Sequence, residues 1–365
     1  MKKTLLFLIL FISFVFIFVS LKNQKNEKQE NVSPDSIKNS SSVSPKYDSS
    51  KNLKIRKFIF VPYWTIEDGS DIGNDGFNDF VYFGITADKN GINKEGLGYK
   101  RLNIFSAFRT NKDNNFLSVV MTDSGINSLI LEDKKTQENL INESIDIAKQ
   151  YSFKGVVLDF EISALSFEKV IKDINSFYGL FYEKSKKKNL DFKITIYGDV
   201  FYRIRPYDLT YLSKNSDGVM IMAYDFHKSK GNPGPNFPLK GREKYGYDFE
   251  NMINDFLKKV PKEKIEVVFG LFGYDWTVNE KNESIKNAKA LSFNEIKNKF
   301  LGKCYERDCI IKRDDKSSET KITYKDENLE NHIVWFEDME SVGAKIEYLK
   351  TKGINSVGYW AYSYF

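Results

Sequence analysis

Residues 155–161 have the sequence Gly-Val-Val-Leu-Asp-Phe-Glu, in which three apolar residues in a row lead into two carboxylates, Asp159 and Glu161. The apolar run predicts a buried parallel strand. Because side chains alternate between the faces of a strand, Asp159 and Glu161 are expected to point the same way. At the mouth of a barrel that direction is inward, where loss of water raises the pKa of a carboxyl group. The pair is therefore a candidate for acid–base chemistry.

Apolar, β-rich segments of this kind recur along the chain with helical segments between them. Strands are expected at 58–64, 80–86, 116–122, 153–160, 192–197, 218–224, 267–272 and 356–360. Helices are expected at 137–151, 166–187 (with Ser166 as its N-cap), 249–260 and 337–352. Eight strands alternating with helices predict a (β/α)8 TIM barrel. The competing doubly wound sheet would normally show a glycine-rich phosphate loop after an early strand, and the sequence has none.

Residues 1–21 have the pattern of a membrane anchor or a signal peptide. Met1-Lys2-Lys3 precedes a stretch from Thr4 to Leu21 that has no charge and is rich in Leu, Phe and Ile. This length approaches a membrane span, and no small-x-small cleavage site follows it, so an uncleaved anchor is expected in preference to a cleaved signal. Residues 22–52 contain mostly Asn, Ser, Lys, Glu and Gln, which predicts a disordered tether. The globular domain, residues 53–365, is therefore expected to be exported and extracytoplasmic.

The composition of the 365-residue chain narrows the classes of function. A hydrophobic content of 41% suffices for a large core. The net charge is +5, but no basic cluster is interleaved with aromatic residues, so no nucleic-acid partner is expected. Mild attraction to an anionic cell wall or membrane is a better interpretation of the charge. The protein is expected to be a monomer.

Histidine and cysteine are scarce in this chain. With only His227 and His332, a His-rich zinc site and a Ser-His-Asp triad are both disfavoured, and no metal or cofactor is expected. Cys304 and Cys309 lie in a polar stretch, residues 277–331, that is predicted to be a small insertion near the seventh strand. Their spacing does not fit a CxxC motif. They form either a small loop-closing disulfide or two free thiols, and export favours the disulfide.

The expected C-terminal ends of the strands, where a barrel of this type places its chemistry, carry carboxylates and aromatic residues. Aromatic faces stack on sugar rings and polar groups bond to hydroxyls, so this composition suits a glycan. Besides Asp159 and Glu161, the candidates are Tyr63, Trp64, Met222, Tyr224, Asp225, Tyr274, Trp276 and Trp360.

The order of these motifs resembles glycoside hydrolase family 18, which contains chitinases, endo-β-N-acetylglucosaminidases and peptidoglycan-lytic enzymes. The resemblance covers about Ile55 to Phe365 and rests on Asp159-x-Glu161, Met222-x-Tyr224-Asp225 and a terminal strand tryptophan, Trp360. The central family motif is DxxDxDxE, and this chain matches only its second half. Lys154 and Val157 stand where the first two aspartates would be.

The resemblance implies hydrolysis of β-1,4 linkages in a glycan that contains N-acetylglucosamine, either peptidoglycan or chitin. It also implies a retaining mechanism in which the substrate's acetamido oxygen is the nucleophile. Glu161 is then the general acid and base, while Asp159 and Tyr224 orient the acetamido group. Asp225 helps to bind the sugar, and Trp360 is the apolar floor. Because Val157 cannot share a hydrogen bond with Asp159, the pH optimum or the turnover is expected to differ from that of fully matched relatives.

Other interpretations remain open at this stage. Met222 is more readily explained by barrel packing than by contact with substrate. Tyr274 and Trp276 could line a subsite or simply fill a loop. The alternative function is a non-catalytic, lectin-like glycan-binding protein on the same barrel, and a two-carboxylate hydrolase is a third possibility. Cell-wall glycan is expected in preference to chitin, since no chitin-binding module is evident.

Overall fold

The computed structural model describes residues 53–66, 76–108, 114–162, 166–304 and 309–365. The predicted anchor (1–21) and the predicted tether (22–52) lie outside these described residues. Among the described helices, none has the length and apolar character needed to cross a membrane.

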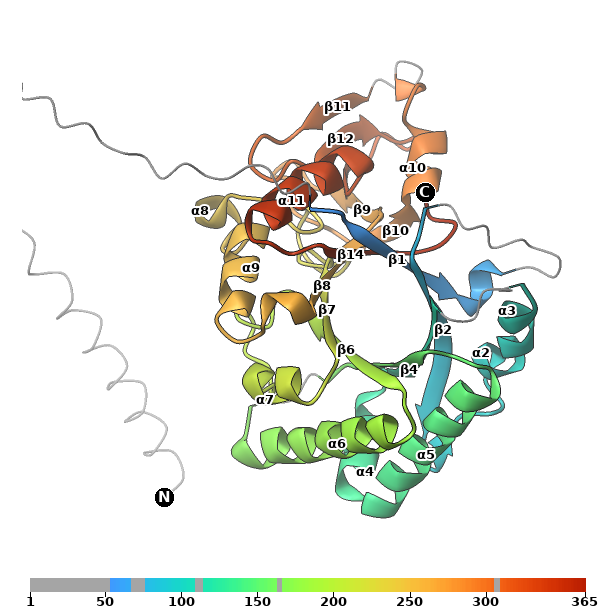
Figure 1. The fold of residues 1–365 in the computed structure, drawn as a ribbon. Helices are drawn as coiled ribbons and strands as arrows, with labels where there is room; N and C mark the ends of the chain where they lie inside the picture. The colour runs from blue at the N-terminus through green and yellow to red at the C-terminus, as the bar shows by residue number, and fades with distance from the viewer. Residues whose placement is uncertain (1–52, 67–75, 109–113, 163–165, 305–308) are drawn as a thin grey trace, which may run out of the picture. The chain divides into compact units, whose positions relative to one another are not determined.

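Eight parallel strands close into a barrel, as the alternating pattern predicts (Figure 1). Around the barrel the order is β1-β14-β8-β7-β6-β5-β4-β2, and β2 pairs with β1 to complete the ring. The TIM-barrel prediction is therefore confirmed. These strands are β1 (Arg56–Pro62), β2 (Asp79–Asp88), β4 (Asn115–Met121), β5 (Gly155–Phe160), β6 (Asp191–Tyr197), β7 (Gly218–Ala223), β8 (Ile265–Gly270) and β14 (Ser356–Trp360).

Helices surround the barrel on its outside (Figure 1), and the longer ones, α5, α6 and α9, each bury apolar side chains in its core. In α6 (Glu168–Lys187) the buried stripe is Ile174, Phe177, Tyr178 and Phe181. The other helices are α2 (Leu97–Lys100), α3 (Leu102–Phe108), α4 (Ser124–Glu132), α5 (Lys134–Gln150), α7 (Leu209–Lys214), α8 (Arg242–Tyr245), α9 (Phe249–Leu257), α10 (Phe293–Lys299) and α11 (Met339–Thr351). The remaining short elements are two 3-10 turns and a two-residue strand: η1 (Tyr63–Thr65), η3 (Lys262–Lys264) and β3 (Gly91–Ile92).

The N-terminal cap predicted for α6 is wrong. The helix begins at Glu168, its N-cap is Phe167, and no side chain caps its first turn. By contrast, α5 begins with a side-chain cap, because Asp133 accepts hydrogen bonds from the backbone N–H groups of Lys135 and Thr136.

The interior of the barrel is apolar at mid-height. Inward side chains from seven positions form one buried cluster: Phe58, Phe60, Val81, Phe116, Val157, Met220 and Val268. A buried ion pair, Lys193 Nζ to Glu266 Oε1 at 2.7 Å, fills the lumen near the strand beginnings. Because side chains alternate along each strand, the residue two places after an interior one also points inward. Asp159 thus follows Val157 on the inner face of β5.

A five-stranded antiparallel sheet is inserted between β8 and α11 (Figure 1). Its order is β10-β9-β13-β12-β11, with α10 between β10 and β11. The sheet extends from Phe272 to Phe336, wider at both ends than the predicted 277–331. Its strands are β9 (Phe272–Val278), β10 (Lys289–Ser292), β11 (Ile310–Arg313), β12 (Thr320–Lys325) and β13 (Asn331–Phe336).

The early start of this sheet changes where the seventh barrel strand ends. β8 stops at Gly270, and the chain passes at once into β9, which pairs with β13 and β10 instead of a barrel strand. Gly273 permits this close pairing, because a Cβ there would lie 2.1 Å from the carbonyl oxygen of Trp335. The residues after Gly270 are therefore side chains of the inserted sheet.

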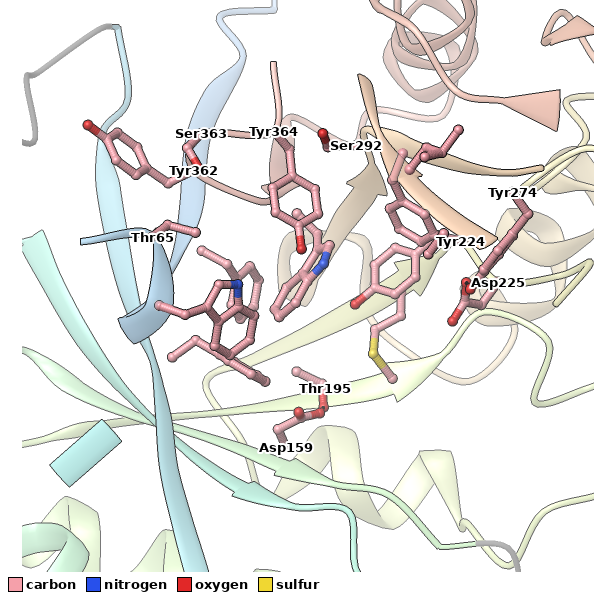
Figure 2. Close-up of a pocket in the computed structure, with 18 of the residues that line it drawn as sticks. Thr65, Asp159, Thr195, Tyr224, Asp225, Tyr274, Ser292, Tyr362, Ser363 and Tyr364 are labelled. Atoms are coloured by element: carbon pink, nitrogen blue, oxygen red, sulfur yellow. Dashed lines mark hydrogen bonds between the residues drawn. The ribbon is translucent and has the colours of Figure 1, made fainter. Parts of the chain in front are cut away.

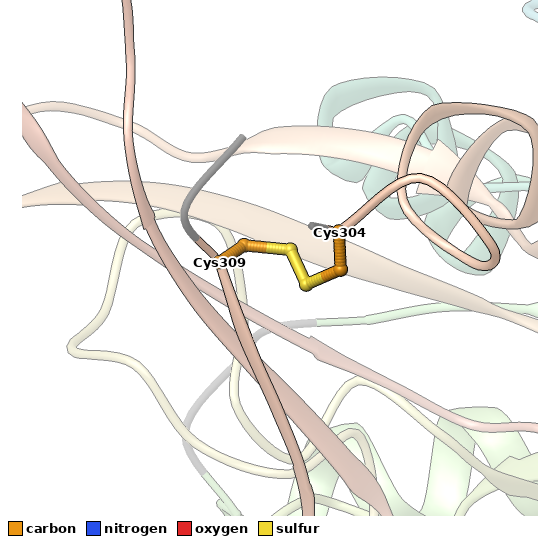
Figure 3. The surroundings of a disulfide bond; sticks show 2 residues. All are labelled: Cys304 and Cys309. Atoms are coloured by element: carbon orange, nitrogen blue, oxygen red, sulfur yellow. A yellow bond between two sulfur atoms is a disulfide. The ribbon is translucent and has the colours of Figure 1, made fainter. Parts of the chain in front are cut away.

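The insertion also contains the disulfide between Cys304 and Cys309 (Figure 3). The bond closes a loop between α10 and β11, with a Cα–Cα distance of 5.0 Å. Among the described residues no cysteine is left free.

Candidate active site

The C-terminal ends of the barrel strands, together with one edge of the inserted sheet, surround an open cleft of about 870 Å³. Figure 2 shows Asp159 beside Thr195, and Asp225 beside Tyr274 farther along the cleft. Glu161 lines the same cleft. The predicted carboxylate pair is thus brought to one cavity by β5, as strand alternation requires.

Glu161 is held at both its backbone and its side chain. Its N–H donates to the carbonyl of Met121 at 2.8 Å, and its carbonyl accepts from Asn127 Nδ2 at 2.8 Å. Its carboxylate Oε2 accepts a hydrogen bond from Tyr197 Oη at 2.6 Å. The guanidinium of Arg205 lies 3.6 Å from the centre of the Tyr197 ring, which fixes the donor in turn. The carboxylate therefore has one strong, preoriented donor and faces the cleft.

Asp159 lies deeper than Glu161, with 4% of its surface exposed. Its Oδ1 accepts a hydrogen bond from the hydroxyl of Thr195 on β6. Burial raises the pKa of Asp159 to about 7, the negative charge of Glu161 adds to the rise, and the Thr195 hydrogen bond opposes it. Asp159 therefore keeps its proton to a much higher pH than an ordinary aspartate does.

Tyr224 and Asp225 follow β7 on the neighbouring wall. Burial, reinforced by the negative charge of Asp159, raises the pKa of Tyr224 well above its usual value, so its hydroxyl stays protonated and can donate. Burial also raises the pKa of Asp225, against a hydrogen bond of 2.7 Å that Tyr274 Oη donates to its Oδ1. The backbone N–H of Asp225 donates to Asn236 Oδ1 at 2.7 Å, which fixes the carboxyl group at the cleft.

An aromatic surface forms the opposite side of the cleft. Trp360, at the end of β14, contacts Phe83 edge-on with ring centres 4.7 Å apart. The ring centre of Trp64 lies 6.3 Å from that of Trp360, and 46% of the surface of Trp64 is exposed, so its ring is available to a ligand. Such rings suit the apolar faces of pyranose sugars.

Most of the predicted site residues line this cleft, namely Asp159, Glu161, Met222, Tyr224, Asp225, Tyr274, Trp64 and Trp360. Tyr63 does not, because its ring packs over Gly84 and edge-on against Trp64, at 5.1 Å between ring centres. It supports Trp64 from behind.

For Trp276 the prediction of a substrate contact is wrong. Its side chain is fully buried within the inserted sheet, where it packs against Val278, Ile333 and Trp335. The physical reason is that Tyr274 and Trp276 lie on β9. Side chains two residues apart on a strand share a face, and the two ring centres are 5.5 Å apart. Tyr274 lies at the cleft end of this face and reaches Asp225, whereas Trp276, farther along the strand, fills the core of the insertion.

The comparison with known proteins decides the family. The sequence model of glycosyl hydrolases family 18 matches residues 19–364. The chain belongs to glycosyl hydrolases family 18. The resemblance drawn from the strand ends is thereby confirmed.

Two relatives from Bacillus match part of this family 18 chain. A Bacillus subtilis protein named as a sporulation-specific glycosylase, YdhD, is 24% identical over 238 residues, 63% of this chain and 52% of that protein. A cortical fragment-lytic enzyme of Bacillus anthracis is 27% identical over 258 residues, 69% of this chain and 55% of that enzyme. The matched segment thus spans about half the length of these relatives.

Among solved structures, a class V chitinase from Nicotiana tobaccum superposes with a TM-score of 0.72 at 15% identity. The superposition covers 86% of this chain and 95% of that one, and it shows the shared fold. The matched family model and both relatives are named for hydrolase, glycosylase or lytic activity, and none of them supports the alternative of a non-catalytic glycan-binding protein.

The sequence motifs did not predict three residues of this family 18 site. Thr195 and Tyr197 occupy alternate inward positions of β6, in register with the interior Lys193, so a period-two analysis of that strand could have found them. Asn236 lies in the loop after β7 and bonds both Asp225 and the carbonyl of Gly270, at 3.0 Å. Nothing in its local sequence indicates this role.

The departures from the family 18 motif have visible consequences. Lys154 forms an ion pair with Asp191 at 3.7 Å, at the far end of β5 from the cleft. Val157 is buried among the apolar residues of the lumen. Its neighbour on β4 is Ser118, whose buried hydroxyl oxygen has no hydrogen-bond partner. An aspartate at position 157 would have offered that hydroxyl an acceptor.

Proposed function

We propose that this protein hydrolyses β-1,4 linkages at N-acetylglucosamine, with the acetamido oxygen of the substrate as nucleophile. The observation that supports this most directly is the condition of Asp159, which is buried, bonded by Thr195 and protonated up to about pH 7. A neutral, buried carboxyl group is a poor nucleophile, which disfavours a two-carboxylate retaining mechanism through Asp159. The likeness to glycoside hydrolase family 18 implies that the nucleophile is instead the acetamido oxygen of the substrate.

In the proposed reaction Glu161 donates a proton to the leaving glycosidic oxygen and afterwards accepts one from the attacking water. Its fixed hydrogen bond from Tyr197 keeps the carboxyl group oriented during both transfers.

Asp159 and Tyr224 position the acetamido group in this proposal. The substrate N–H lies against Asp159 when that group is ionised, so the positive charge that develops on the cyclic oxazolinium intermediate is stabilised. The Tyr224 hydroxyl, protonated at all ordinary pH values, donates to the acetamido oxygen. Trp360 packs below the sugar ring, and Asp225 bonds to a sugar hydroxyl.

For the substrate we propose cell-wall glycan in preference to chitin. The Bacillus relatives named for sporulation and for cortical fragments favour this choice. The uncharged stretch at residues 4–21 fits an exported protein held at a membrane. Recovery of the full chain in the carbonate-resistant membrane fraction supports the anchor, and recovery in the soluble fraction refutes it.

The test of the activity compares chitin oligomers with purified peptidoglycan as substrates of the full chain. Release of reducing ends from either one supports a hydrolase, and a higher kcat/KM on peptidoglycan supports the choice of substrate. Cleavage of neither, with binding retained, would overturn the proposed hydrolysis in favour of glycan binding alone.

A further inference from the structure

A second cavity lies on the inserted sheet, away from the cleft, where the ends of β12 and β13 meet. Three potential metal ligands face one another there: Asp326, Glu330 and His332. One ligand atom from each lies within 4.8 Å of the others. These residues take no part in the proposed hydrolysis.

His332 is oriented by a carboxylate behind it. Its Nδ1 lies 2.8 Å from Asp275 Oδ1, and a carboxylate can only accept, so Nδ1 carries the hydrogen. Asp275 is itself buried, and its other oxygen accepts from Tyr324 Oη at 2.7 Å and from Lys299 Nζ at 3.2 Å. A carboxylate–histidine pair of this kind presents the lone pair of Nε2 to a metal ion.

The Nε2 atom of His332 is buried and has no hydrogen-bond partner. Asp326 Oδ2, an acceptor, is 3.8 Å from it. A cation between these two electron-rich atoms would give the unsatisfied Nε2 the partner that it lacks.

The Asp326 side chain is held by its own turn. Its Oδ1 accepts from the backbone N–H of Asn328 at 3.0 Å and from that of Glu330 at 2.8 Å, which leaves Oδ2 directed at His332. Glu330 is partly exposed and forms an ion pair with Lys286 at 3.2 Å. A surface pair of this kind is weak, so a metal ion can readily replace the lysine.

We propose that His332, Asp326 and Glu330 bind one divalent ion of the zinc type on the inserted sheet. Imidazole nitrogen with two carboxylates is a donor set that zinc accepts, with water in the fourth position. Ligand distances of about 2.0–2.2 Å require the donor atoms to approach to about 3.4 Å. The present spacing of up to 4.8 Å closes to that value through side-chain rotation. The site needs a single histidine, so the scarcity of histidine does not exclude it.

The ion would join the β12–β13 turn to β9 through His332 and Asp275. Tyr274, the neighbour of Asp275 on β9, bonds Asp225 in the cleft. The site is therefore a structural clamp on the strand that forms one cleft wall, and its existence does not depend on the proposed hydrolysis.

The test uses the full chain, stripped with EDTA and titrated with ZnCl2 by calorimetry, with CoCl2 as a spectroscopic probe. We expect one equivalent of Zn²⁺ to bind, a rise in Tm, and visible cobalt bands that indicate a nitrogen–oxygen site. His332→Gln and Asp326→Asn should each weaken Zn²⁺ binding at least tenfold. Glu330→Gln, at a partly exposed position that tolerates substitution, should weaken it severalfold, which keeps the test valid if a buried variant fails to fold.

His227→Gln is the matched control, because it removes the chain's other histidine, whose Nδ1 bonds the carbonyl of Pro235. Zinc binding should be unchanged in this variant. Absence of binding at about 1 mM Zn²⁺ would overturn the proposal. Equal binding in all variants would overturn it as well.

Discussion

The catalytic proposal depends at the residue scale on two carboxyl groups in different surroundings. Asp159 is buried, and its pKa is raised to about 7 by burial and by the charge of Glu161. Glu161, in contact with Tyr197 Oη, faces the cleft where a substrate oxygen would arrive. Glu161 is therefore placed to transfer a proton, and Asp159 to orient the substrate.

Replacement of Glu161 tests the acid directly. Glu161→Gln keeps the shape and the Tyr197 contact but cannot transfer a proton, so kcat should fall by about 10²–10⁴-fold with KM little changed. Steady-state kinetics on N-acetylglucosamine oligomers measures this. Glu347→Gln, an exposed glutamate of α11 paired with Lys350, is the matched control and should keep full activity. Retained turnover in Glu161→Gln would show that Glu161 is not the general acid.

The raised pKa of Asp159 predicts a pH dependence of activity and of stability. The value of kcat/KM should fall as pH rises through about 7, because Asp159 then loses its proton. The folded state holds this proton between pH 4 and 7 while the unfolded chain, with an ordinary aspartate pKa, has released it. The contribution to the free energy of unfolding is therefore full below about pH 4 and lost as pH rises to 7, on the order of a few kcal/mol.

Asp159→Asn removes the pH-dependent contribution of Asp159 to the free energy of unfolding and leaves the contributions of other groups in place. The variant should show a flatter dependence of the urea midpoint on pH between 4 and 7 than the parent protein does. A midpoint that falls just as steeply in the variant would assign the slope to another group.

Val157 is the position where this chain departs most from its family, and two substitutions measure the consequence. Val157→Asp adds a third carboxyl group two residues from Asp159 on the same face and gives Ser118 an acceptor. The added negative charge holds the proton of Asp159 more tightly, so the alkaline limb of kcat/KM should move to higher pH. Val157→Asn supplies the acceptor without the charge, and its limb should stay in place. Equal profiles in both variants would contradict this.

At the scale of elements, the inserted sheet is fastened to the barrel by a buried charge cluster. Lys345 of α11 is fully buried between Glu319 at 3.1 Å and Glu337 at 2.6 Å. Glu319 also accepts from the backbone N–H of Phe237, at 2.8 Å, and from that of Asn236. The loop that positions Asp225 is thereby tied to the insertion.

Replacement of Lys345, the buried cation of this cluster, should weaken the attachment of the inserted sheet and lower the stability of the fold. Lys345→Met leaves buried carboxylates without their partner and should lower the free energy of unfolding by about 3–5 kcal/mol. Chemical denaturation measures this loss. Lys350→Met, on the same helix in a surface pair with Glu347, should change it by about 0.5 kcal/mol or less. An equal change in the free energy of unfolding in the two variants would show that the buried cluster stabilises the fold no more than a surface ion pair does.

The sequence predicted elements better than it predicted their ends. All eight barrel strands were located, because parallel strands buried on both faces are continuous apolar runs. The end of the seventh was misplaced, since β9 continues the apolar, aromatic pattern of β8 into a different sheet. The misassignment of Trp276 follows from that error. Hydrogen-bond partners decide which sheet a strand joins, and a single sequence does not reveal them.

On the scale of the whole molecule, the cleft is assembled from parts that lie far apart in the chain. Trp64 follows β1, Ser292 comes from the inserted sheet, and Tyr364 from the segment after β14. Asn294 of α10 bonds that last segment, donating its N–H to the carbonyl of Tyr364 at 2.8 Å. The carboxylates could be predicted because they lie on one strand, and Trp64 because it follows the first strand. Ser292 and Tyr364 could not, because only the tertiary fold brings them to the cleft.

The stereochemistry of the first product tests the central claim most directly. Proton NMR of the reaction on an N-acetylglucosamine oligomer, recorded before mutarotation, distinguishes the two anomers of the new reducing end. Attack by the acetamido oxygen followed by water gives net retention, so the β-anomer should appear first. An initial α-anomer would contradict the account, because it requires direct displacement by water with inversion.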